Sequence, residues 1–188
     1  MKTLIFNGSP KINGDTEALI LELSSHLNGE VKIISSRNDI KPCNDCRYCW
    51  ENIGCAINDE MQDIYPFIET CDNIVLASPI WFSSLSGPLL NMTSRVQAIW
   101  AADYFQNKPI PLKEKKGIII IVGAQIETKN IPTQTAVTIM KHFNVHRPSI
   151  TIIYSLNTNN LSANKDEIAL KQCCEAADML NRNWNIIH

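Results

Sequence analysis

Short apolar runs alternate along this chain with longer stretches of helical periodicity, and this alternation most constrains the fold. Five runs with the composition of strands cover residues 3–6, 31–35, 73–77, 117–122 and 150–154. Between and after them, apolar residues recur at helical spacing in residues 16–27, 61–71, 88–102, 132–143 and 166–183. Such alternation implies parallel strands joined by right-handed helical crossovers, so helices cover both faces of one sheet. The sequence therefore predicts a three-layer α/β fold.

Length and composition predict a single domain. The chain has 188 residues, of which 45% are hydrophobic, enough for one sizeable core. No internal repeat and no break in composition separates a second unit. We expect one domain over residues 1–188, with residues 38–59 as an insertion, because that segment is too long for an ordinary strand-to-helix connection.

The charge balance favours a small-molecule partner. The chain has 17 basic and 19 acidic residues, a formal net charge of −2, so no strong field favours nucleic acid or anionic lipid. Residues 4–6 are too short an apolar run for a secretory signal, and residues 118–122 form a strand-sized run far shorter than a membrane span. We expect a cytoplasmic protein that binds neither nucleic acid nor membrane. Its seven cysteines should then be reduced.

The loop after the first strand, residues 7–16, has the chemistry of an anion site. Gly8 and Gly14 allow backbone conformations that expose amide hydrogens, and the helix that follows offers its positive N-terminal end. Additional side-chain donors and one charge are present at Ser9, Lys11, Asn13 and Thr16. The alternative is an ordinary turn in which Asp15 or Thr16 only caps the helix. The Lys-Ser or Lys-Thr ending of a Walker loop and the three-glycine dinucleotide fingerprint are both missing.

The loop after the third strand, residues 77–90, contains two large aromatic side chains. Trp81 and Phe82 lie in a Ser, Gly and Pro-rich loop and suit the edge or face of a planar heterocycle. The alternative is that both rings seal the end of the sheet beneath the next helix. In an open parallel sheet, ligands bind outside the carboxyl ends of the strands where the strand order reverses, so this loop and the first one are the places to expect a site.

These two loops resemble those of the flavodoxin-like NAD(P)H-dependent FMN reductase family. The family's first loop reads Gly-Ser-Pro-Arg, a short spacer and Gly-Asn-Thr, and its third loop reads Ser-Pro-Ile-Tyr-Phe followed by Ser-Gly-Pro-Leu. The first-loop matches in this chain are Gly8, Ser9, Pro10, Gly14 and Thr16, with Lys11 in place of the arginine and Asp15 in place of the asparagine. The third loop here carries Ser78-Pro79-Ile80-Trp81-Phe82 and then Ser86-Gly87-Pro88-Leu89.

The resemblance implies a flavodoxin-like three-layer sandwich with a five-stranded parallel sheet in the order 2-1-3-4-5. It implies an enzyme that passes a hydride from NAD(P)H to bound FMN and then electrons to a quinone, a nitro or azo compound or another acceptor. Homodimers or homotetramers are common in the family. The implied cofactor-binding residues are Ser9, Lys11, Asn13, Asp15, Thr16, Pro79, Ile80, Trp81, Phe82 and Gly123.

Flavin chemistry of this kind requires no general acid or base, so we expect no catalytic side chain. Trp50, Trp100 and Tyr104 are candidates for lining the substrate face. The rival reading is a non-enzymatic electron carrier, either flavodoxin-like or of the iron-sulfur flavoprotein type.

Two departures from the family pattern bear on the site. An ionised Asp15 would repel a neighbouring phosphate unless its carboxylate turns away or accepts backbone amide hydrogens. In the helix after the third loop, Leu90 and Ser94 occupy the positions of a family lysine and aspartate, which leaves only Arg95 of that group.

A compact cysteine motif occupies the insertion. Cys43, Cys46, Cys49 and Cys55 have the spacing Cys-x2-Cys-x2-Cys-x5-Cys, and four thiolates suit zinc or an iron-sulfur cluster. The iron-sulfur flavoproteins, relatives of the reductase family, carry such a motif, which makes a [4Fe–4S] cluster a candidate cofactor. The alternative is a cluster-free loop that shapes the substrate pocket, as in similar reductases with cysteines before an Asp-Asp-Met-like helix start; residues 59–61 match that start.

The three remaining cysteines carry a weaker signal. Cys71 ends a predicted helix, and Cys173 and Cys174 lie in the last amphipathic stretch, so we expect all three to pack in the core. His142 and His146 have the spacing of helical metal ligands, but they lie at a predicted helix end, where histidine suits the helix dipole.

Overall fold

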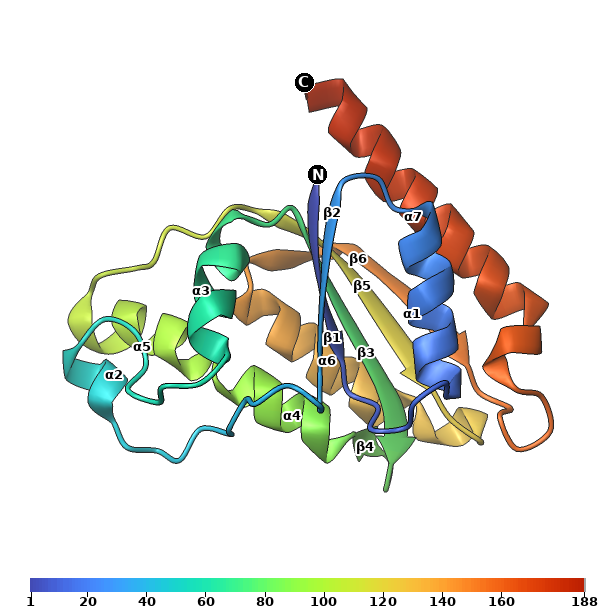
Figure 1. Ribbon diagram of the computed structural model, residues 1–188, viewed down its shortest axis with the longest axis horizontal. Helices are drawn as coiled ribbons and strands as arrows, with labels where there is room; N and C mark the ends of the chain where they lie inside the picture. The colour runs from blue at the N-terminus through green and yellow to red at the C-terminus, as the bar shows by residue number, and fades with distance from the viewer. Residues whose placement is uncertain (188) are drawn as a thin grey trace.

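The computed structural model describes the backbone of residues 1–187 and the side chains of residues 1–182. Its centre is a parallel sheet of five strands (Figure 1): β1 (Lys2–Asn7), β2 (Glu30–Ser35), β3 (Asn73–Trp81), β5 (Lys115–Val122) and β6 (Val145–Ser155). Their spatial order is β2-β1-β3-β5-β6, which is the predicted order 2-1-3-4-5 when the parallel strands alone are counted. A short sixth strand, β4 (Ser84–Leu85), pairs antiparallel with the end of β3 and was not predicted.

Helices cover both faces of the sheet, as predicted. One face packs against α1 (Asp15–His26) and α7 (Glu167–Ile187) (Figure 1). The other face packs against α3 (Met61–Thr70), α4 (Gly87–Ser94), α5 (Gln97–Gln106) and α6 (Asn130–His142). Three shorter elements complete the described chain: α2 (Tyr48–Glu51), η1 (Ile126–Thr128) and η2 (Ala163–Lys165).

The two cores follow from the two-residue period of the strands. In β1, Leu4 and Phe6 enter the core beneath α3 to α6, whereas Ile5 between them enters the core beneath α1 and α7. Strand β5, which lies between β3 and β6, is apolar on both faces, and Ile118 to Ile121 are fully buried. Each such side chain contributes on the order of 1.5–3 kcal/mol through burial. The uninterrupted apolar run at residues 118–122 therefore marks a strand that is covered on both faces.

The predicted helix at residues 88–102 is two helices. The main-chain N–H groups of Arg95, Val96 and Ile99 donate to carbonyls three residues earlier, so the chain tightens and turns between α4 and α5. Arg95 lies at this turn with its side chain buried beneath the cysteine segment. Apolar periodicity continues through the turn, which is why the sequence pattern did not reveal it.

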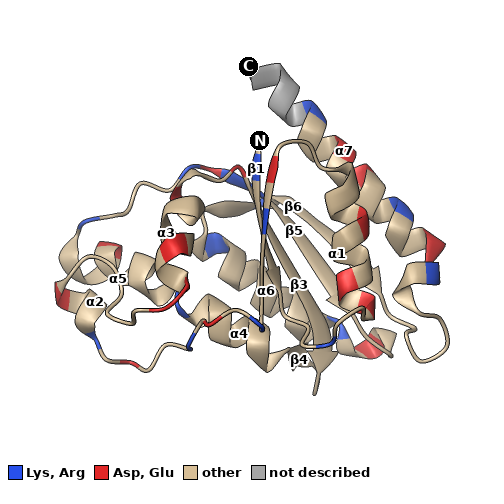
Figure 2. Cartoon of the chain, viewed as in Figure 1, with Lys and Arg blue, Asp and Glu red and all other residues tan. Residues whose placement is uncertain are grey.

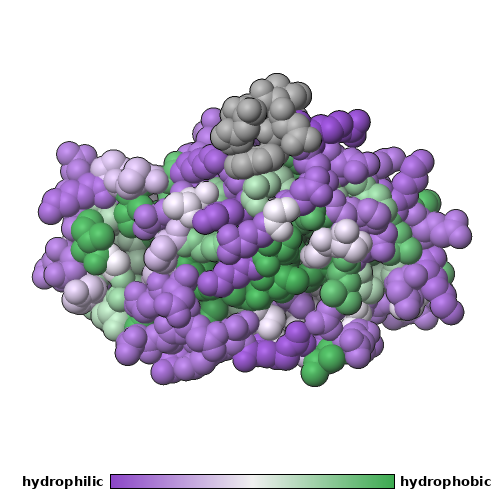
Figure 3. Space-filling model, turned by 45° about the horizontal axis from the view of Figure 1, so that its top comes forward, coloured by the Kyte–Doolittle hydropathy of each residue, from purple (hydrophilic) through white to green (hydrophobic). Residues whose placement is uncertain are grey.

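Residues 38–59 run beside α5 with α2 as their one regular helix (Figure 1). Charged residues of both signs are interspersed along the fold (Figure 2), in keeping with the small net charge. The face seen in Figure 3 is largely hydrophilic, with an apolar band across its middle. None of the described helices combines the length and apolar character needed to cross a membrane.

Candidate functional site

The loops after β1 and β3 are locked together at the carboxyl edge of the sheet. The Gly8 N–H donates to the Ala77 carbonyl (2.8 Å), and the Ser86 hydroxyl donates to the Gly8 carbonyl (2.7 Å). A Cβ on Gly8 would lie 2.6 Å from the Leu89 Cβ and 2.7 Å from the Ser86 Oγ. Glycine is therefore required here because neighbouring chain segments approach so closely.

The loop after β1 presents uncapped amides to a ligand. Gly14 is the N-cap of α1, and no side chain caps the first turn of that helix. Ser9 and Thr16 are buried beside this turn. Within the loop, the Ser9 N–H donates to the Asn7 side chain (2.9 Å) and the Lys11 N–H to the Ser9 hydroxyl (3.3 Å). A shaped loop ahead of an uncapped helix N-terminus has the chemistry that favours an anion.

Both acidic residues in the first turn of α1 are engaged by other groups. The Asp15 carboxylate accepts hydrogen bonds from the Ser162 hydroxyl (2.8 Å) and the Ala163 N–H (2.7 Å). Partial burial opposes its charge, but these two hydrogen bonds and the nearby Lys11 hold the pKa of Asp15 below its ordinary value. Asp15 therefore stays ionised while its carboxylate is turned toward η2, one of the two conditions under which it does not oppose a phosphate.

Glu17 is held in the same manner. Its carboxylate accepts from Arg37 (3.0 Å) and from the Asn13 N–H (2.5 Å), and these two interactions lower the pKa of Glu17. The carboxylate fixes the Asn13 backbone, which adopts a left-handed φ of 52°. The acids that border this loop thus shape it and leave the first-turn amides of α1 open.

The loop after β3 projects its aromatic rings into solvent. Trp81 and Ser84 are paired across a two-residue turn made by Phe82 and Ser83, with left-handed φ values of 49° and 57°. That turn suits asparagine and glycine, so a phenylalanine and a serine there store strain. Trp81 is 42% exposed and Phe82 fully exposed, so these rings do not seal the end of the sheet. Strained, exposed aromatic residues at the end of a buried strand indicate a ligand surface.

Gly123 brings the end of β5 against the same loop. A Cβ on Gly123 would lie 2.8 Å from the Ile80 Cδ1, and its N–H donates to the Ser155 carbonyl (2.8 Å). Because β1, β3 and β5 are neighbours in the sheet, three predicted groups share one edge: residues 9–16, residues 79–82 and Gly123.

The four cysteines of the insertion line one cavity of about 270 Å³. Cys43 and Cys46 are exposed and Cys49 and Cys55 half-buried. Burial raises the pKa of the Cys49 thiol, and negative charge on the other three thiols adds to that rise. Among the described side chains, no three of these sulfur atoms lie within 4.8 Å of one another. Zn–S bonds of about 2.3 Å would bring four sulfurs to about 3.8 Å from one another, closer than the described arrangement brings any three of them.

Of the aromatic residues predicted near a substrate, Trp50 and Trp100 line this cysteine cavity together with Phe105. Trp50 stacks on Phe105 with ring centroids 4.2 Å apart. Tyr104 stacks on Trp100 at 4.8 Å and is 69% exposed, outside the cavity lining.

A buried ion pair anchors both ends of the cysteine segment. The Arg95 Nη1 lies 2.5 Å from the Asp59 Oδ2, and neither side chain is exposed to solvent. Arg95 also donates to the carbonyls of Lys41 (2.9 Å) and Ile57 (3.2 Å). Asp59 accepts from the N–H groups of Lys41 (2.9 Å) and Met61 (3.1 Å). Burial opposes the charge of Asp59, but its hydrogen bonds hold its pKa below the ordinary value.

Side chains of neighbouring helices hold three of the cysteines by their backbones. The Cys43 N–H donates to the Ser94 hydroxyl (2.9 Å), so the residue that replaces the family aspartate now positions a cysteine. Gln106 donates to the Cys49 carbonyl and Gln62 to the Cys55 carbonyl, each at 2.9 Å. The sequence did not predict these roles of Ser94, Gln62 and Gln106, nor the pairing of Arg95 with Asp59. Its only signal was the presence of both charged residues in the family pattern.

Comparison with known proteins identifies the family. The sequence profile of the family described as NADPH-dependent FMN reductase matches residues 1–149. The chain belongs to this family. The resemblance of its two loops is thereby confirmed.

Curated relatives include iron-sulfur flavoproteins. One from Methanocaldococcus jannaschii is 30% identical over 128 residues, which cover 66% of this chain and 63% of the relative. One from Methanosarcina thermophila is 27% identical over 127 residues, covering 65% of this chain and 63% of the relative. The chain thus matches about three fifths of the length of these relatives.

Solved structures confirm the flavodoxin-like fold. Smu.1420 from Streptococcus mutans has a TM-score of 0.71 at 16% identity, covering 97% of this chain and 100% of that chain. An FMN-dependent NADH-azoreductase from Bacillus anthracis has a TM-score of 0.61 at 16% identity, covering 96% and 99%. An NAD(P)H:quinone oxidoreductase from Methanothermobacter marburgensis has a TM-score of 0.66 at 12% identity, covering 94% and 97%. At these identities the likeness shows the fold alone.

Replacing Gly8 by alanine should destabilise the protein, because the added Cβ meets the Leu89 Cβ at 2.6 Å and the Ala77 carbonyl at 3.0 Å. We expect a loss of about 1–3 kcal/mol in the free energy of unfolding. Gly87→Ala is the matched control, since a Cβ there meets nothing within 4 Å. Equal urea-unfolding midpoints for the two variants would contradict the locked contact between the loops.

Asp59→Asn should leave the buried Arg95 charge without its partner and reduce the free energy of unfolding by about 3–5 kcal/mol. Asp63→Asn, at an exposed position of α3, should change it by less than about 0.5 kcal/mol. Urea unfolding at pH 7 measures both.

The same pair gives a pH dependence with a defined sign. The folded state lowers the pKa of Asp59 below its ordinary value of 3.8. The ionised carboxylate therefore stabilises the fold above about pH 4, and this stabilisation is lost as the pH falls through the folded-state pKa. The difference in the free energy of unfolding between wild type and Asp59→Asn should therefore become smaller below about pH 4. If the free energies of unfolding of wild type and Asp59→Asn differ by the same amount from pH 7 to pH 3, ionised Asp59 does not stabilise the fold.

Proposed function

We propose that this protein is an FMN-dependent oxidoreductase that takes electrons from NAD(P)H and delivers them to a small-molecule acceptor such as a quinone or a nitro or azo compound. One observation carries the proposal: an uncapped helix N-terminus and an exposed aromatic hairpin are locked together at neighbouring strand ends. Membership of the FMN reductase family supports it, as do azoreductases and a quinone oxidoreductase among proteins of the same fold.

The residues present fit the phosphate of FMN. The first turn of α1 offers uncapped amides and positive helix-dipole charge, and the hydroxyls of Ser9 and Thr16 lie beside it. Lys11 and Asn13 complete the predicted set. Since the carboxylate of Asp15 is held by Ser162 and Ala163, this acid does not oppose the phosphate.

The residues present also fit a planar ring. Pro79 to Phe82 would contact the flavin ring along one side, and the exposed rings of Trp81 and Phe82 supply apolar surface for it. Gly123 keeps the end of β5 free of a side chain next to Ile80. When bound, FMN supplies reversible acceptance of a hydride.

The task of this chain is then to bind and orient the ring and to aim backbone donors where negative charge develops. No side chain is assigned as catalytic. We further propose that residues 1–188 act as one flavin-binding domain that works in the cytoplasm as a homodimer or homotetramer, as the family resemblance implies.

Thr16→Val should weaken FMN binding but leave riboflavin binding unchanged, because only FMN carries the phosphate. Loss of one hydrogen bond to a charged group corresponds to roughly a 10- to 150-fold higher Kd. Quenching of flavin fluorescence measures both ligands, and Thr138→Val, at an exposed position of α6, is the control. An equal loss for FMN and riboflavin, or no loss for either, would show that Thr16 does not hold the phosphate.

A second candidate function is that of an iron-sulfur flavoprotein-type electron carrier. Four thiols that line one cavity favour it, and so do the names of the curated relatives. The cysteines Cys43, Cys46, Cys49 and Cys55 would hold a [4Fe–4S] cluster, which supplies one-electron transfer when bound. Ser94, Gln62 and Gln106 fix the backbone that presents these thiols.

Anaerobic purification should yield a brown protein with about four irons per chain. Cys49→Ser should lose most of this iron, whereas Cys71→Ser, which alters a buried cysteine that ends α3, should retain it. Iron and acid-labile sulfide analysis measures the content. If the wild-type protein contains no iron, or if both variants contain equal iron, the cysteine motif is a cluster-free loop and the carrier hypothesis is wrong.

A further inference from the structure

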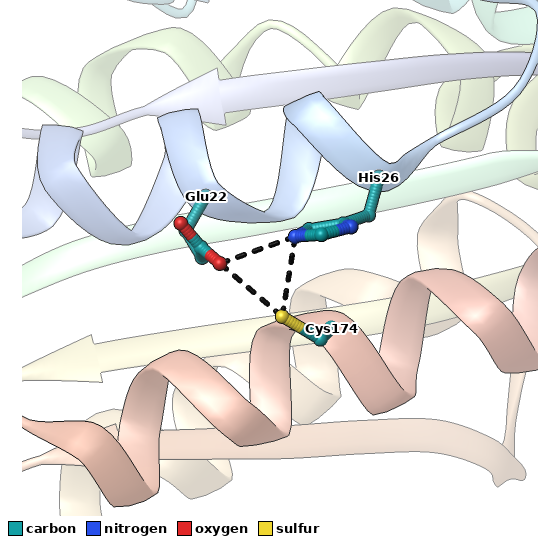
Figure 4. Close-up of side chains that lie close together, drawn as sticks. All are labelled: Glu22, His26 and Cys174. Atoms are coloured by element: carbon teal, nitrogen blue, oxygen red, sulfur yellow. Dashed lines mark hydrogen bonds and ion pairs between the residues drawn. The ribbon is translucent and has the colours of Figure 1, made fainter.

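A second group of metal-ligand side chains lies on the opposite face of the sheet from the cysteine cavity. Glu22 and His26 project from successive turns of α1 toward Cys174 on α7 (Figure 4). The Glu22 Oε1 lies 3.2 Å from the His26 Nε2, and the Cys174 Sγ lies 3.2 Å from the first atom and 3.3 Å from the second. Cys174 is half-exposed, so the expectation that it packs in the core is wrong, whereas Cys173 is buried as expected.

The three atoms converge on one point, as metal ligands do. Tetrahedral zinc, with bonds of about 2.0–2.3 Å, separates nitrogen, oxygen and sulfur ligands by about 3.3–3.6 Å, close to the distances observed here. A nucleophilic triad would require the carboxylate and the thiol on different nitrogens of the imidazole. Here both meet the same Nε2, so a relay between Cys174 and Glu22 through the ring is excluded.

The surroundings hold the three side chains in place. The Asn181 side chain donates to the His26 carbonyl (2.8 Å) and accepts from the Asn28 N–H (2.9 Å), which fixes the end of α1 against α7. The buried Cys173 donates to the Leu19 carbonyl (3.6 Å) one helical turn earlier on α1. The ligands therefore lie on two helices whose relative position is set by independent contacts, and little ordering is left for a metal to impose.

We propose that Glu22, His26 and Cys174 form a zinc site that joins α1 to the C-terminal helix. One sulfur, one nitrogen and one oxygen ligand suit zinc, whereas Mg²⁺ and Ca²⁺ prefer oxygen alone. Without the ion the thiol donates to Glu22, and zinc binding releases that proton to solvent. The half-exposed position leaves a fourth place for water. The site ties the last helix to the sheet and is independent of flavin binding.

Zinc titration of the reduced, metal-free protein against a chromophoric chelator tests the proposal. Cysteine thiols are common zinc ligands, so the titration uses a Cys43→Ser, Cys46→Ser background, which removes two of the four thiols of the insertion, as well as wild type. We expect the background protein to bind one equivalent of zinc tightly. Adding either His26→Ala or Cys174→Ser to it should raise the Kd for this zinc at least tenfold. His146→Ala, an exposed histidine on β6, is the matched control and should retain it.

Thermal unfolding gives a second readout. With free zinc at about one hundred times its Kd, the background protein should gain about 5–10 °C in Tm, and its His26→Ala derivative should gain at most about half as much. If the background protein folds poorly, wild type and its His26→Ala variant provide the comparison. Wild type should bind one more equivalent of zinc per chain tightly than the variant. Equal zinc uptake with and without His26→Ala in both backgrounds would overturn the site.

Discussion

The pairing of β1 with β3 at the centre of the sheet is the constraint on which the rest of the structure depends. Parallel pairing places the carboxyl ends of these strands side by side, and β2 and β5 extend the sheet in opposite directions from them. The strand order reverses at this point, where an open α/β sheet leaves a crevice for a ligand. The hydrogen bond from Ser86 to Gly8 closes the two loops into one unit.

The sequence predicted the layers and the two loops because each follows from local chemistry, whereas the strand order came from the family resemblance alone. Apolar runs at residues 3–6 and 118–122 mark buried parallel strands whatever surrounds them. The sequence did not predict the turn between α4 and α5, because Arg95 at this turn pairs with Asp59, which lies 36 residues earlier in the chain. The group of Glu22, His26 and Cys174 was missed for the same reason, since α1 and α7 meet only after the sheet has formed.

The cysteine segment shows how a long loop acquires a defined conformation without regular structure. A salt bridge with no exposure to solvent ties its two ends, and side chains from three helices hold its cysteines by their backbones. A buried charge pair of this kind adds little net stability but strongly penalises the loss of either partner. The Arg95–Asp59 pair therefore fixes the ends of the segment that carries the thiols, so their position depends on the folded core.

The central claim is that the edge formed by the loops after β1, β3 and β5 binds FMN for electron transfer from NAD(P)H. Anaerobic titration of the FMN-supplemented protein, followed by its visible spectrum, tests this claim most directly. The account predicts that the protein takes up about one FMN per chain, as one such edge allows, and that NADH or NADPH bleaches the bound flavin. A protein that takes up no FMN, or bound flavin that stays yellow with both nucleotides, would contradict it.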